Sequence, residues 1–280
     1  MSTTAPYATS LSDEQWDVLQ RLLPEPKWQP GGPGRPPLNL RRVVDGIFYV
    51  NKTGCQWRMM PRDLGSGMTI YGYFRRWRQQ GVWSDLMDTL RTWQRRDQGR
   101  KDDPSAACAD SQSIKMTTQN QDGGFDGNKK IKGRKRHTVV DTLGLLLAVV
   151  VTAAHVDDRQ GFMTLLETYL ARGARRLRKI WVDQGYEAPW LKDWAADLKQ
   201  THKIDVEVVE RQGKGFHVEP HRWKVERTFS WICKDRPNCR DYEGLTCNSE
   251  AMIQISTVNV RPSHRAHRKK RDFSKKADIT

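Results

Sequence analysis

The stretch Ala-Ala-Cys-Ala-Asp-Ser-Gln-Ser-Ile-Lys, residues 106–115, decides how the rest of the chain is interpreted. Its first four residues are small and mostly apolar, and they lead directly into one carboxylate, Asp110. This pattern predicts a buried strand over 106–110 that ends by presenting an acid at the edge of a sheet. A carboxylate in such a place is costly unless a cation meets it. A second apolar run, Lys179–Asp183, ends in the same way, and a third acid, Glu226, lies within a helical pattern.

The chain has 280 residues, a formal net charge of +15 at pH 7 and a hydrophobic content of 37%. This length is sufficient for one large domain or two ordinary ones, and the hydrophobic content is that of a globular protein. So much positive charge predicts a polyanionic partner. Nucleic acid is the first choice, and a ribosomal or membrane-surface role is the alternative.

The first residues, 1–7, have neither the basic nor the apolar segment of a secretion signal, so none is expected there. The longest apolar run, at 143–154, is too short to cross a bilayer as a helix. The five cysteines are scattered and odd in number, which argues against a disulfide framework. The expected compartment is therefore the cytoplasm.

The N-terminal part of the chain has helical patterns separated by glycine and proline. Amphipathic spacing and capping residues predict four helices, at residues 14–23, 40–52, 70–80 and 82–94. The third helix carries Arg75, Arg76 and Arg78 among aromatic residues, and a glycine-proline arm carries Arg35. These helices and arginines are typical of a helix-turn-helix-like DNA-binding domain. The simpler alternative is an amphipathic helix with a solvated basic face.

Beyond residue 105 the pattern changes from helices to strands. Strands are predicted at residues 106–110, 134–141, 145–154, 178–183 and 205–210. Helices are predicted at 158–172 and 190–200, and a last helix carries Glu226. This order predicts an α/β domain with a mixed sheet. The predicted divisions are a helical DNA-binding domain at 1–95, a linker at 96–105, the α/β domain at 106–260 and a basic, disordered tail at 261–280.

Three carboxylates of this kind are sufficient for phosphoryl transfer on nucleic acid. That chemistry uses two divalent ions about 3.5–4 Å apart, which activate the attacking oxygen and hold the leaving one. Such hard ions prefer oxygen ligands, which Asp and Glu supply. Any one of these acids, taken alone, is more often a helix cap or a surface residue.

Several short motifs occur in order along the chain. In the first half they are Gly46–Val50, Thr53–Arg58 and Tyr73–Trp77. In the second half they are Asp110–Lys115, Lys132–His137, Val140–Leu145, Trp181–Tyr186, Val225–Trp231 and Asp241–Glu243. Each is weak alone. Together, over about residues 11–260, they resemble DDE-type insertion-sequence transposases, in the IS-five branch of the IS-four-like group.

The resemblance implies an RNase H-like catalytic domain with a mixed five-stranded sheet. Its catalytic and metal-binding acids would be Asp110, Asp183 and Glu226, holding two Mg²⁺ ions or Mn²⁺ in their place. In this fold the first and fourth strands are parallel neighbours, so the two aspartates would lie about 4.8 Å apart at one edge. Asp157 and Asp158 are competing acids, but their strand is two positions away, and capping of the next helix is the better interpretation.

The resemblance also gives the basic run before the second strand a role in DNA binding. That strand would run antiparallel to the first, so its start would lie beside the acids, where it could hold DNA phosphates. The predicted contacts are Lys130, Lys132, Arg134, Lys135, Arg136 and His137, with Arg222 one helical turn before Glu226. A merely solvated charge run is the alternative.

The implied function is that of a DNA transposase. It would bind the terminal inverted repeats of an insertion sequence, cleave a strand with a metal-activated water and join the freed 3′ end to target DNA. Its partners would be double-stranded DNA, at element ends and target, and further copies of itself in a dimer or larger assembly. The expected location is the bacterial cytoplasm, at the nucleoid.

Two other functions remain open from the sequence. A DNA-binding protein without catalysis, such as a repressor or a repurposed transposase, is favoured by departures from the family pattern at Cys233, Asp235 and Pro237. An RNase H-like nuclease acting on RNA or Holliday junctions is the third hypothesis, and the long helical N-terminal region argues against it.

Overall fold

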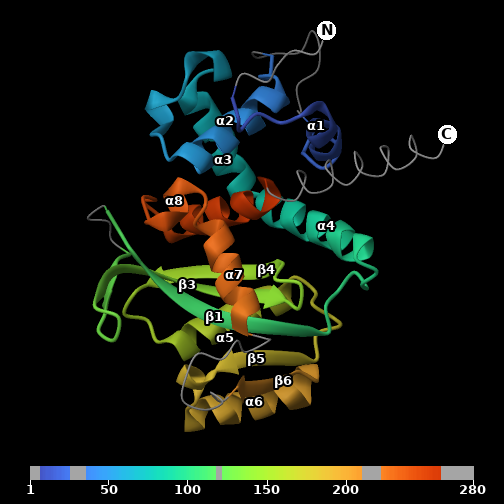
Figure 1. Cartoon of the computed structure of the whole chain (residues 1–280), viewed down its shortest axis with the longest axis vertical. Helices are drawn as coiled ribbons and strands as arrows, with labels where there is room; N and C mark the ends of the chain where they lie inside the picture. The colour runs from blue at the N-terminus through green and yellow to red at the C-terminus, as the bar shows by residue number, and fades with distance from the viewer. Residues whose placement is uncertain (1–6, 26–35, 118–121, 210–221, 260–280) are drawn as a thin grey trace, which may run out of the picture. The chain divides into compact units, whose positions relative to one another are not determined.

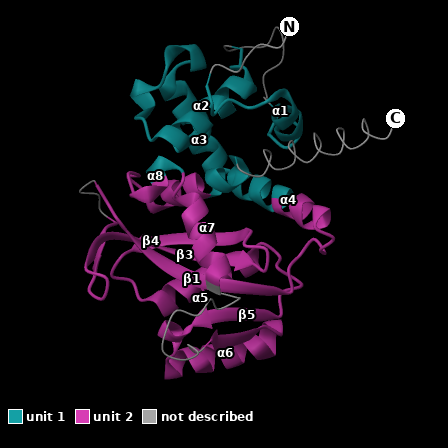
Figure 2. Ribbon diagram, in the orientation of Figure 1, with its two compact units in different colours: residues 1–90, 235–237, 254–280 teal, residues 91–234, 238–253 magenta. Residues whose placement is uncertain are grey.

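The computed structural model describes residues 7–25, 36–117, 122–209 and 222–259. The chain separates into two compact units (Figure 2). The first contains residues 1–90, 235–237 and 254–280, and the second contains 91–234 and 238–253. The predicted tail at 261–280 and the arm residue Arg35 lie outside the described residues. Across the described ranges, every helix is too short or too polar to cross a bilayer.

The first unit is helical, as predicted. Its helices are α1 (Asp13–Leu19), α2 (Leu40–Thr53), α3 (Gly67–Gln79) and the start of α4 (Val82–Asp97), with short 3-10 turns η1 (Trp57–Met59) and η2 (Arg62–Leu64). Local chemistry sets their ends. Ser12 and Gln15 form a capping box at α1, and the Asn39 side chain caps α2. Gly54 ends α2 with φ at 70°, a conformation that favours glycine.

Polar contacts join α2 to later parts of the chain within the first unit. Lys52 Nζ lies 2.9 Å from Asp235 Oδ1, and Ser256 Oγ donates a hydrogen bond to Asn51 Oδ1 at 3.1 Å. Asp235 is buried, so its carboxylate requires this cationic partner. One of the departures from the family pattern therefore has a structural role. The short helix α8 (Arg236–Cys239) follows it.

The second unit is built on a six-stranded mixed sheet. Its strands are β1 (Ala106–Lys115), β2 (Gly124–Asp126), β3 (Ile131–Asp141), β4 (Leu146–Ala153), β5 (Lys179–Asp183) and β6 (Asp205–Val209). The order is β2-β3-β1-β5-β6, with β4 also paired to β3. β3 runs antiparallel to both β1 and β4, whereas β5 and β6 run parallel to β1. The predicted RNase H-like α/β fold is confirmed, and the three-residue strand β2 is an addition to the expected five.

Strand β1 is longer than predicted. It continues five residues past Asp110, and all of this extension is paired with β3, up to Lys115 opposite Gly133. The alternating residues Ser111 and Ser113 are buried there. The expectation that the strand ends at Asp110 was wrong, because polar residues in a strand find buried hydrogen-bond partners from distant parts of the chain.

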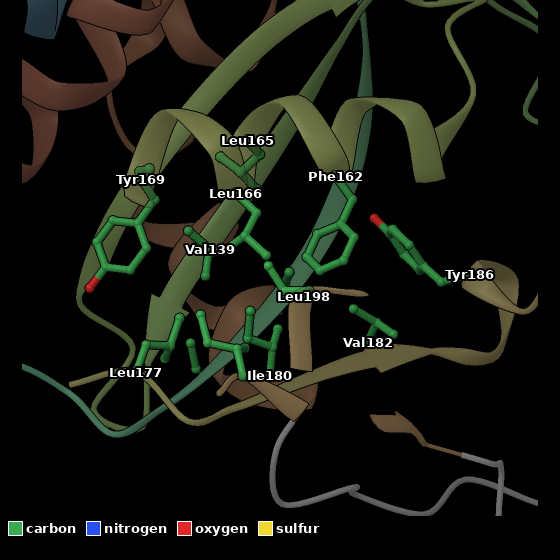
Figure 3. Packing of buried hydrophobic residues seen from close by; sticks show 14 of the residues in the cluster. Val139, Phe162, Leu165, Leu166, Tyr169, Leu177, Ile180, Val182, Tyr186 and Leu198 are labelled. Carbon is green, nitrogen blue, oxygen red and sulfur yellow. The ribbon is translucent and has the colours of Figure 1, made fainter. Parts of the chain in front are cut away.

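Helices cover both faces of the sheet. α5 (Asp158–Ala171) and α6 (Pro189–His202) contribute to one core cluster, in which Phe162, Leu165 and Leu166 pack against strand residues (Figure 3). Those strand residues are Ala107, Ala109, Val139, Ile180 and Val182. α7 (Arg222–Ile232) crosses β1, β3 and β5 (Figure 1). The cluster contains no described residue of α7, although α7 contacts the same strands. Because neighbouring residues of a strand point to opposite faces, α7 lies on the face away from this cluster.

A buried aspartate stabilises the turn between β3 and β4. Asp141 is fully buried, and its Oδ1 accepts hydrogen bonds from the backbone N–H groups of Leu143 at 2.8 Å and Leu145 at 2.9 Å. Its second oxygen is paired with the buried guanidinium of Arg95. Gly144 has φ at 75°, as the predicted tight turn requires.

Candidate active site

Asp110 lies in the middle of β1, half-buried, opposite Thr138 of β3. Its Oδ1 accepts a hydrogen bond from the N–H of Ser111 at 2.7 Å. Asp183 is the last residue of β5 and caps the 3-10 turn η3 (Gln184–Tyr186), where its Oδ1 accepts from the N–H of Gly185 at 3.0 Å. Both side chains are thus held at one oxygen by the local backbone.

The two aspartates lie on neighbouring parallel strands of the sheet. β1 and β5 are parallel neighbours, as expected, and pair from Ala106 opposite Lys179 to Cys108 opposite Trp181. Asp110 and Asp183 each lie two residues beyond the last pair of this ladder. Paired neighbouring strands are separated by about 4.8 Å, so the two residues lie near each other in the sheet.

Both aspartates belong to the face of the sheet that α7 covers. Ala109 and Val182, their preceding neighbours, point into the core cluster on the α5 face. Alternation along a strand therefore directs Asp110 and Asp183 to the opposite face. Two carboxylates on neighbouring strands thus belong to one face, and their oxygen atoms are the donors that a hard divalent cation prefers.

Glu226 is carried by α7 over the same face, but its side chain is exposed. The helix is fixed by Thr228 Oγ1 and Arg227 Nη2, which donate hydrogen bonds at 2.8 Å to the carbonyls of Gly144 and Leu143. Among the described residues, no three His, Cys, Asp or Glu side chains are close enough together to hold a metal ion. The structure therefore does not gather Glu226 with the two aspartates.

Tyr186 lies beneath the two aspartates, and sequence reasoning gave it no role. Burial raises the pKa of Tyr186 well above its ordinary value, and the charges of Asp110, Asp158 and Asp183 raise it further. All three carboxylates thus act on one buried phenol. The residue belongs to the quoted motif Trp181–Tyr186, and its place three residues after a strand-end acid was the signal that could have identified it.

The competing acids have different roles. Asp157 caps α5, because its Oδ1 accepts from the N–H of Arg159 at 2.9 Å, as expected. Asp158 is not a cap. Its Oδ1 accepts from Ser111 Oγ at 2.7 Å and lies 2.8 Å from Lys135 Nζ. Burial opposes ionisation, but these two hydrogen bonds lower the pKa of Asp158 overall.

Two arginines of the basic run are buried on the α7 face. Arg134 Nη1 donates to the carbonyl of Glu243 at 2.8 Å and lies 3.3 Å from Asp241 Oδ1. Arg136 Nη2 donates to the carbonyl of Asn238. Both arginine side chains are at most 1% exposed. Their predicted contact with DNA phosphates is therefore corrected, because the structure uses these donors inside the fold.

Lys135 and His137 are buried on the α5 face. Lys135 is paired with Asp158, and His137 Nε2 lies 2.9 Å from Thr152 Oγ1. The His137 ring fills the space that a Cβ on Gly161 of α5 would occupy, since that atom would lie 2.1 Å from the ring. These two residues are likewise reassigned from DNA contact to packing between α5 and the sheet.

The burial of His137 predicts a loss of stability in acid. Burial lowers its pKa to about 4, below the ordinary value of 6.5. At pH 5 the unfolded chain takes up a proton at this residue that the folded chain does not, so acid favours unfolding. Between pH 7 and pH 5, His137 is expected to remove about 2 kcal/mol from the free energy of unfolding.

The measurement is urea denaturation of the wild type and His137→Gln at both pH values. The variant is expected to lose about 2 kcal/mol less than the wild type over this interval, whatever its stability at pH 7. An equal loss in the two proteins would contradict the prediction.

Other predicted DNA contacts are at the surface. Lys130 and Lys132 are exposed at the start of β3, as are Arg75 and Arg76 on α3, whereas Arg78 is half-buried. Arg222 begins α7, and its side chain lies outside the description. These exposed cations remain candidate contacts, and the predictions for Arg35 and Arg222 stay untested.

Two family models match the chain over separate regions. One, described as "Transposase DDE domain", matches residues 101–254, more than half of the chain. The chain therefore belongs to the family of DDE-domain transposases. The other, described as "Putative transposase of IS4/5 family", matches residues 11–87. The resemblance to DDE-type insertion-sequence transposases drawn from the sequence is therefore confirmed.

Curated relatives match shorter stretches. A protein of Burkholderia cepacia, "Insertion element IS402 uncharacterized 16.2 kDa protein", is 37% identical over 40% of this chain and 76% of its own length. The "Putative transposase for insertion sequence element IS402" of the same organism is 30% identical over 36% of this chain and 49% of its own. "Uncharacterized protein y4sN" of Sinorhizobium fredii (strain NBRC 101917 / NGR234) is 27% identical over 29% and 62%. The chain covers less than two thirds of the length of each of the last two relatives.

A solved structure, "Crystal structure of the Mos1 Strand Transfer Complex", aligns with 83% of this chain and 79% of its own. The sequence identity is 11% and the TM-score is 0.27.

Proposed function

We propose that this protein is an insertion-sequence transposase that binds the terminal inverted repeats of its element, cleaves a DNA strand and transfers the freed end. One observation supports the proposal. Asp110 and Asp183 lie two residues beyond the last pair of the parallel neighbours β1 and β5, and α7, which carries Glu226, contacts both strands.

The residues have distinct roles in this proposal. Asp110 and Asp183 would hold divalent cations, Mg²⁺ or Mn²⁺, through their carboxylate oxygens, and Glu226, carried by α7, would be the third acid. When bound, two such ions activate the attacking oxygen and stabilise the leaving one. The two aspartates keep their positions through the backbone hydrogen bonds from Ser111 and Gly185.

Cations at the protein surface support DNA as the substrate. The net charge is +15, and the exposed Arg75, Arg76, Lys130 and Lys132 offer positive groups to phosphates. One relative is named for the insertion element IS402 as its transposase. Because an element has two ends that must be joined, the protein would act as a dimer or larger assembly on DNA.

A second candidate is a DNA-binding protein without catalysis. It is favoured by the exposed Glu226, which the structure does not bring into a group with the aspartates. DNA binding does not separate the two candidates, because both would bind. Strand cleavage does.

The test uses the full chain and a labelled duplex that carries the element's own end, with Mg²⁺, Mn²⁺ or Ca²⁺. Cleavage with Mg²⁺ or Mn²⁺, and its absence with Ca²⁺, is the result expected of a transposase. Binding of the duplex without cleavage under all three conditions would favour the non-catalytic candidate. Cleavage of RNA or of Holliday junctions in preference to the element end would favour a nuclease.

A further inference from the structure

Strands β2 and β3 form a hairpin whose two faces differ. Asp126 of β2 is buried, and its Oδ2 accepts a hydrogen bond from Ser113 Oγ at 2.5 Å. Its Oδ1 accepts from the backbone N–H groups of Asn128 and Lys129, both at 3.0 Å, so one carboxylate ties the turn to the sheet. Phe125, the residue before it, is 57% exposed. The hairpin is therefore held through one face and displays an aromatic ring on the other.

The displayed face is the face of the candidate acids. Phe125 pairs with Lys132 on β3, and Thr138 of the same strand pairs with Asp110 on β1, which lies beside β3 (Figure 1). Residues directly opposite each other in an antiparallel pair share a face, and so do residues an even number apart in one strand. Thr138 is six positions after Lys132. Phe125 therefore belongs to the same face as Asp110.

Three exposed lysines accompany the ring. Lys132 lies directly across from Phe125, and Lys129 and Lys130 lie in the turn; these three are the hairpin lysines. In the described part of the chain, none of the three forms an ion pair. Lys130 has φ at 53°, a left-handed conformation that is unfavourable for a residue with a Cβ and that glycine adopts readily. The turn thus keeps a cation where the backbone alone would favour glycine.

The hairpin lies well away from the aspartates along the sheet. The interval between Lys132 and Thr138, which is opposite Asp110, corresponds to about 20 Å of strand. Successive phosphates of one DNA strand are separated by about 3.4 Å along the helix axis, so this length corresponds to about six base pairs. A duplex that is bound over the aspartates and follows β1 and β3 would reach the hairpin about six base pairs from the cleaved phosphate.

We propose that Phe125 and the hairpin lysines form a second DNA contact, in which the lysines bind phosphates and the phenyl ring enters a groove and unstacks one base step. The inference rests on the proposed function, because that function supplies DNA as the partner and Asp110 as the place of cleavage. Apolar side chains that enter a groove in this way partly unstack the bases and bend the duplex. A rigid aromatic ring among cations matches the two chemical features of DNA, its bases and its charged backbone.

The first test removes the ring. Phe125→Ala is compared with Trp190→Ala, because Trp190 is 46% exposed at the start of α6, which packs on the other face of the sheet. The full chain is titrated with a labelled duplex that carries the element's own end, in Ca²⁺ so that the strand stays intact. A second set of duplexes carries 2-aminopurine, a fluorescent base that brightens when it unstacks, at successive positions.

We expect Phe125→Ala to bind the duplex about 10-fold more weakly than the wild type, while Trp190→Ala keeps wild-type affinity. The wild type should brighten 2-aminopurine at one step, about six base pairs from the cleaved phosphate, and Phe125→Ala should not. Wild-type affinity in Phe125→Ala would overturn the inference. An equal weakening in both variants, or brightening that survives Phe125→Ala, would also overturn it.

The second test removes a hairpin cation without harming the turn. Lys130→Gly should unfold at the wild-type temperature or above, because glycine suits the φ of 53°. Its dependence of DNA affinity on salt should be lower by about one unit of slope. The matched control is Lys192→Gln on α6, where Nζ already lies 3.0 Å from the Glu187 carboxylate. That variant should keep the wild-type slope, and a wild-type slope in Lys130→Gly would overturn the phosphate contact.

Cleavage of the same duplex with Mg²⁺ separates this inference from the proposed function. If the wild type cleaves and Phe125→Ala binds as tightly as the wild type, only the second contact fails. If the wild type does not cleave but unstacks a base through Phe125, the proposed function fails and the DNA contact stands.

Discussion

Replacing Asp183 with asparagine is expected to lower the rate of metal-dependent cleavage of an element-end duplex by about 10³-fold or more. The substitution removes one negative oxygen ligand from the aspartate pair. It should leave the fold intact, because an asparagine oxygen can still accept the hydrogen bond from the N–H of Gly185 that caps η3. Cleavage is measured in single turnover with saturating Mg²⁺, and DNA binding is measured separately.

Asp110→Asn and Glu226→Gln are expected to cause losses of the same size while DNA binding is retained. The matched control is Asp205→Asn on the neighbouring strand β6, where the carboxylate forms surface pairs with Lys179 and Lys199. That variant should cleave at the wild-type rate. Cleavage that survives Glu226→Gln but not the aspartate substitutions would mean that another residue is the third acid, and survival in Asp183→Asn would contradict the site.

Replacing Arg134 with methionine is expected to lower the free energy of unfolding by about 3–5 kcal/mol. The guanidinium is fully buried and donates to the carbonyls of Glu243 and Gly244. It also lies 3.3 Å from the buried carboxylate of Asp241. Removing it leaves that charge and those carbonyls without their cationic donor. Urea denaturation of the two proteins at pH 7 measures the difference.

Lys132→Met on the same strand is the matched comparison, because Lys132 is exposed. Its stability should change by less than about 0.5 kcal/mol. If Lys132 contacts a phosphate, the variant should bind DNA more weakly, with a salt dependence reduced by about one unit of slope. A stable Arg134→Met protein with weakened DNA binding would instead restore the original assignment of Arg134 to DNA.

Much of the fold could be predicted from local patterns. The apolar runs of β4 and β5 and the capping signals of α1 and α2 identify elements that depend on a few neighbouring residues. The parallel neighbouring of β1 and β5 came from the family resemblance, and the structure confirms it. The assignment of catalytic roles to Asp110, Asp183 and Glu226 stays a prediction.

What could not be predicted depends on partners far away in the chain. Ser111 and Ser113 have the composition of a loop, and only Asp158 and Asp126 make them suitable for a buried strand. The basic run after Lys130 has the composition of a solvated surface. Arg134 is buried because carbonyls and a carboxylate near the C-terminal end of the unit surround it. No local sequence pattern indicates that residues distant in the chain will pair with a buried polar side chain.

Because the ladder between β1 and β5 is short, a small change in the angle between these strands displaces the residues that lie beyond it. The candidate acids lie two residues past its last pair, which corresponds to an arm of about 7 Å. A change of about 5° in the angle between the strands would move the ends of that arm by about 0.6 Å, more than the roughly 0.2 Å tolerance of metal–ligand distances. Substitutions that alter only the twist of β5, β6 or α6 should therefore impair chemistry well before they impair folding.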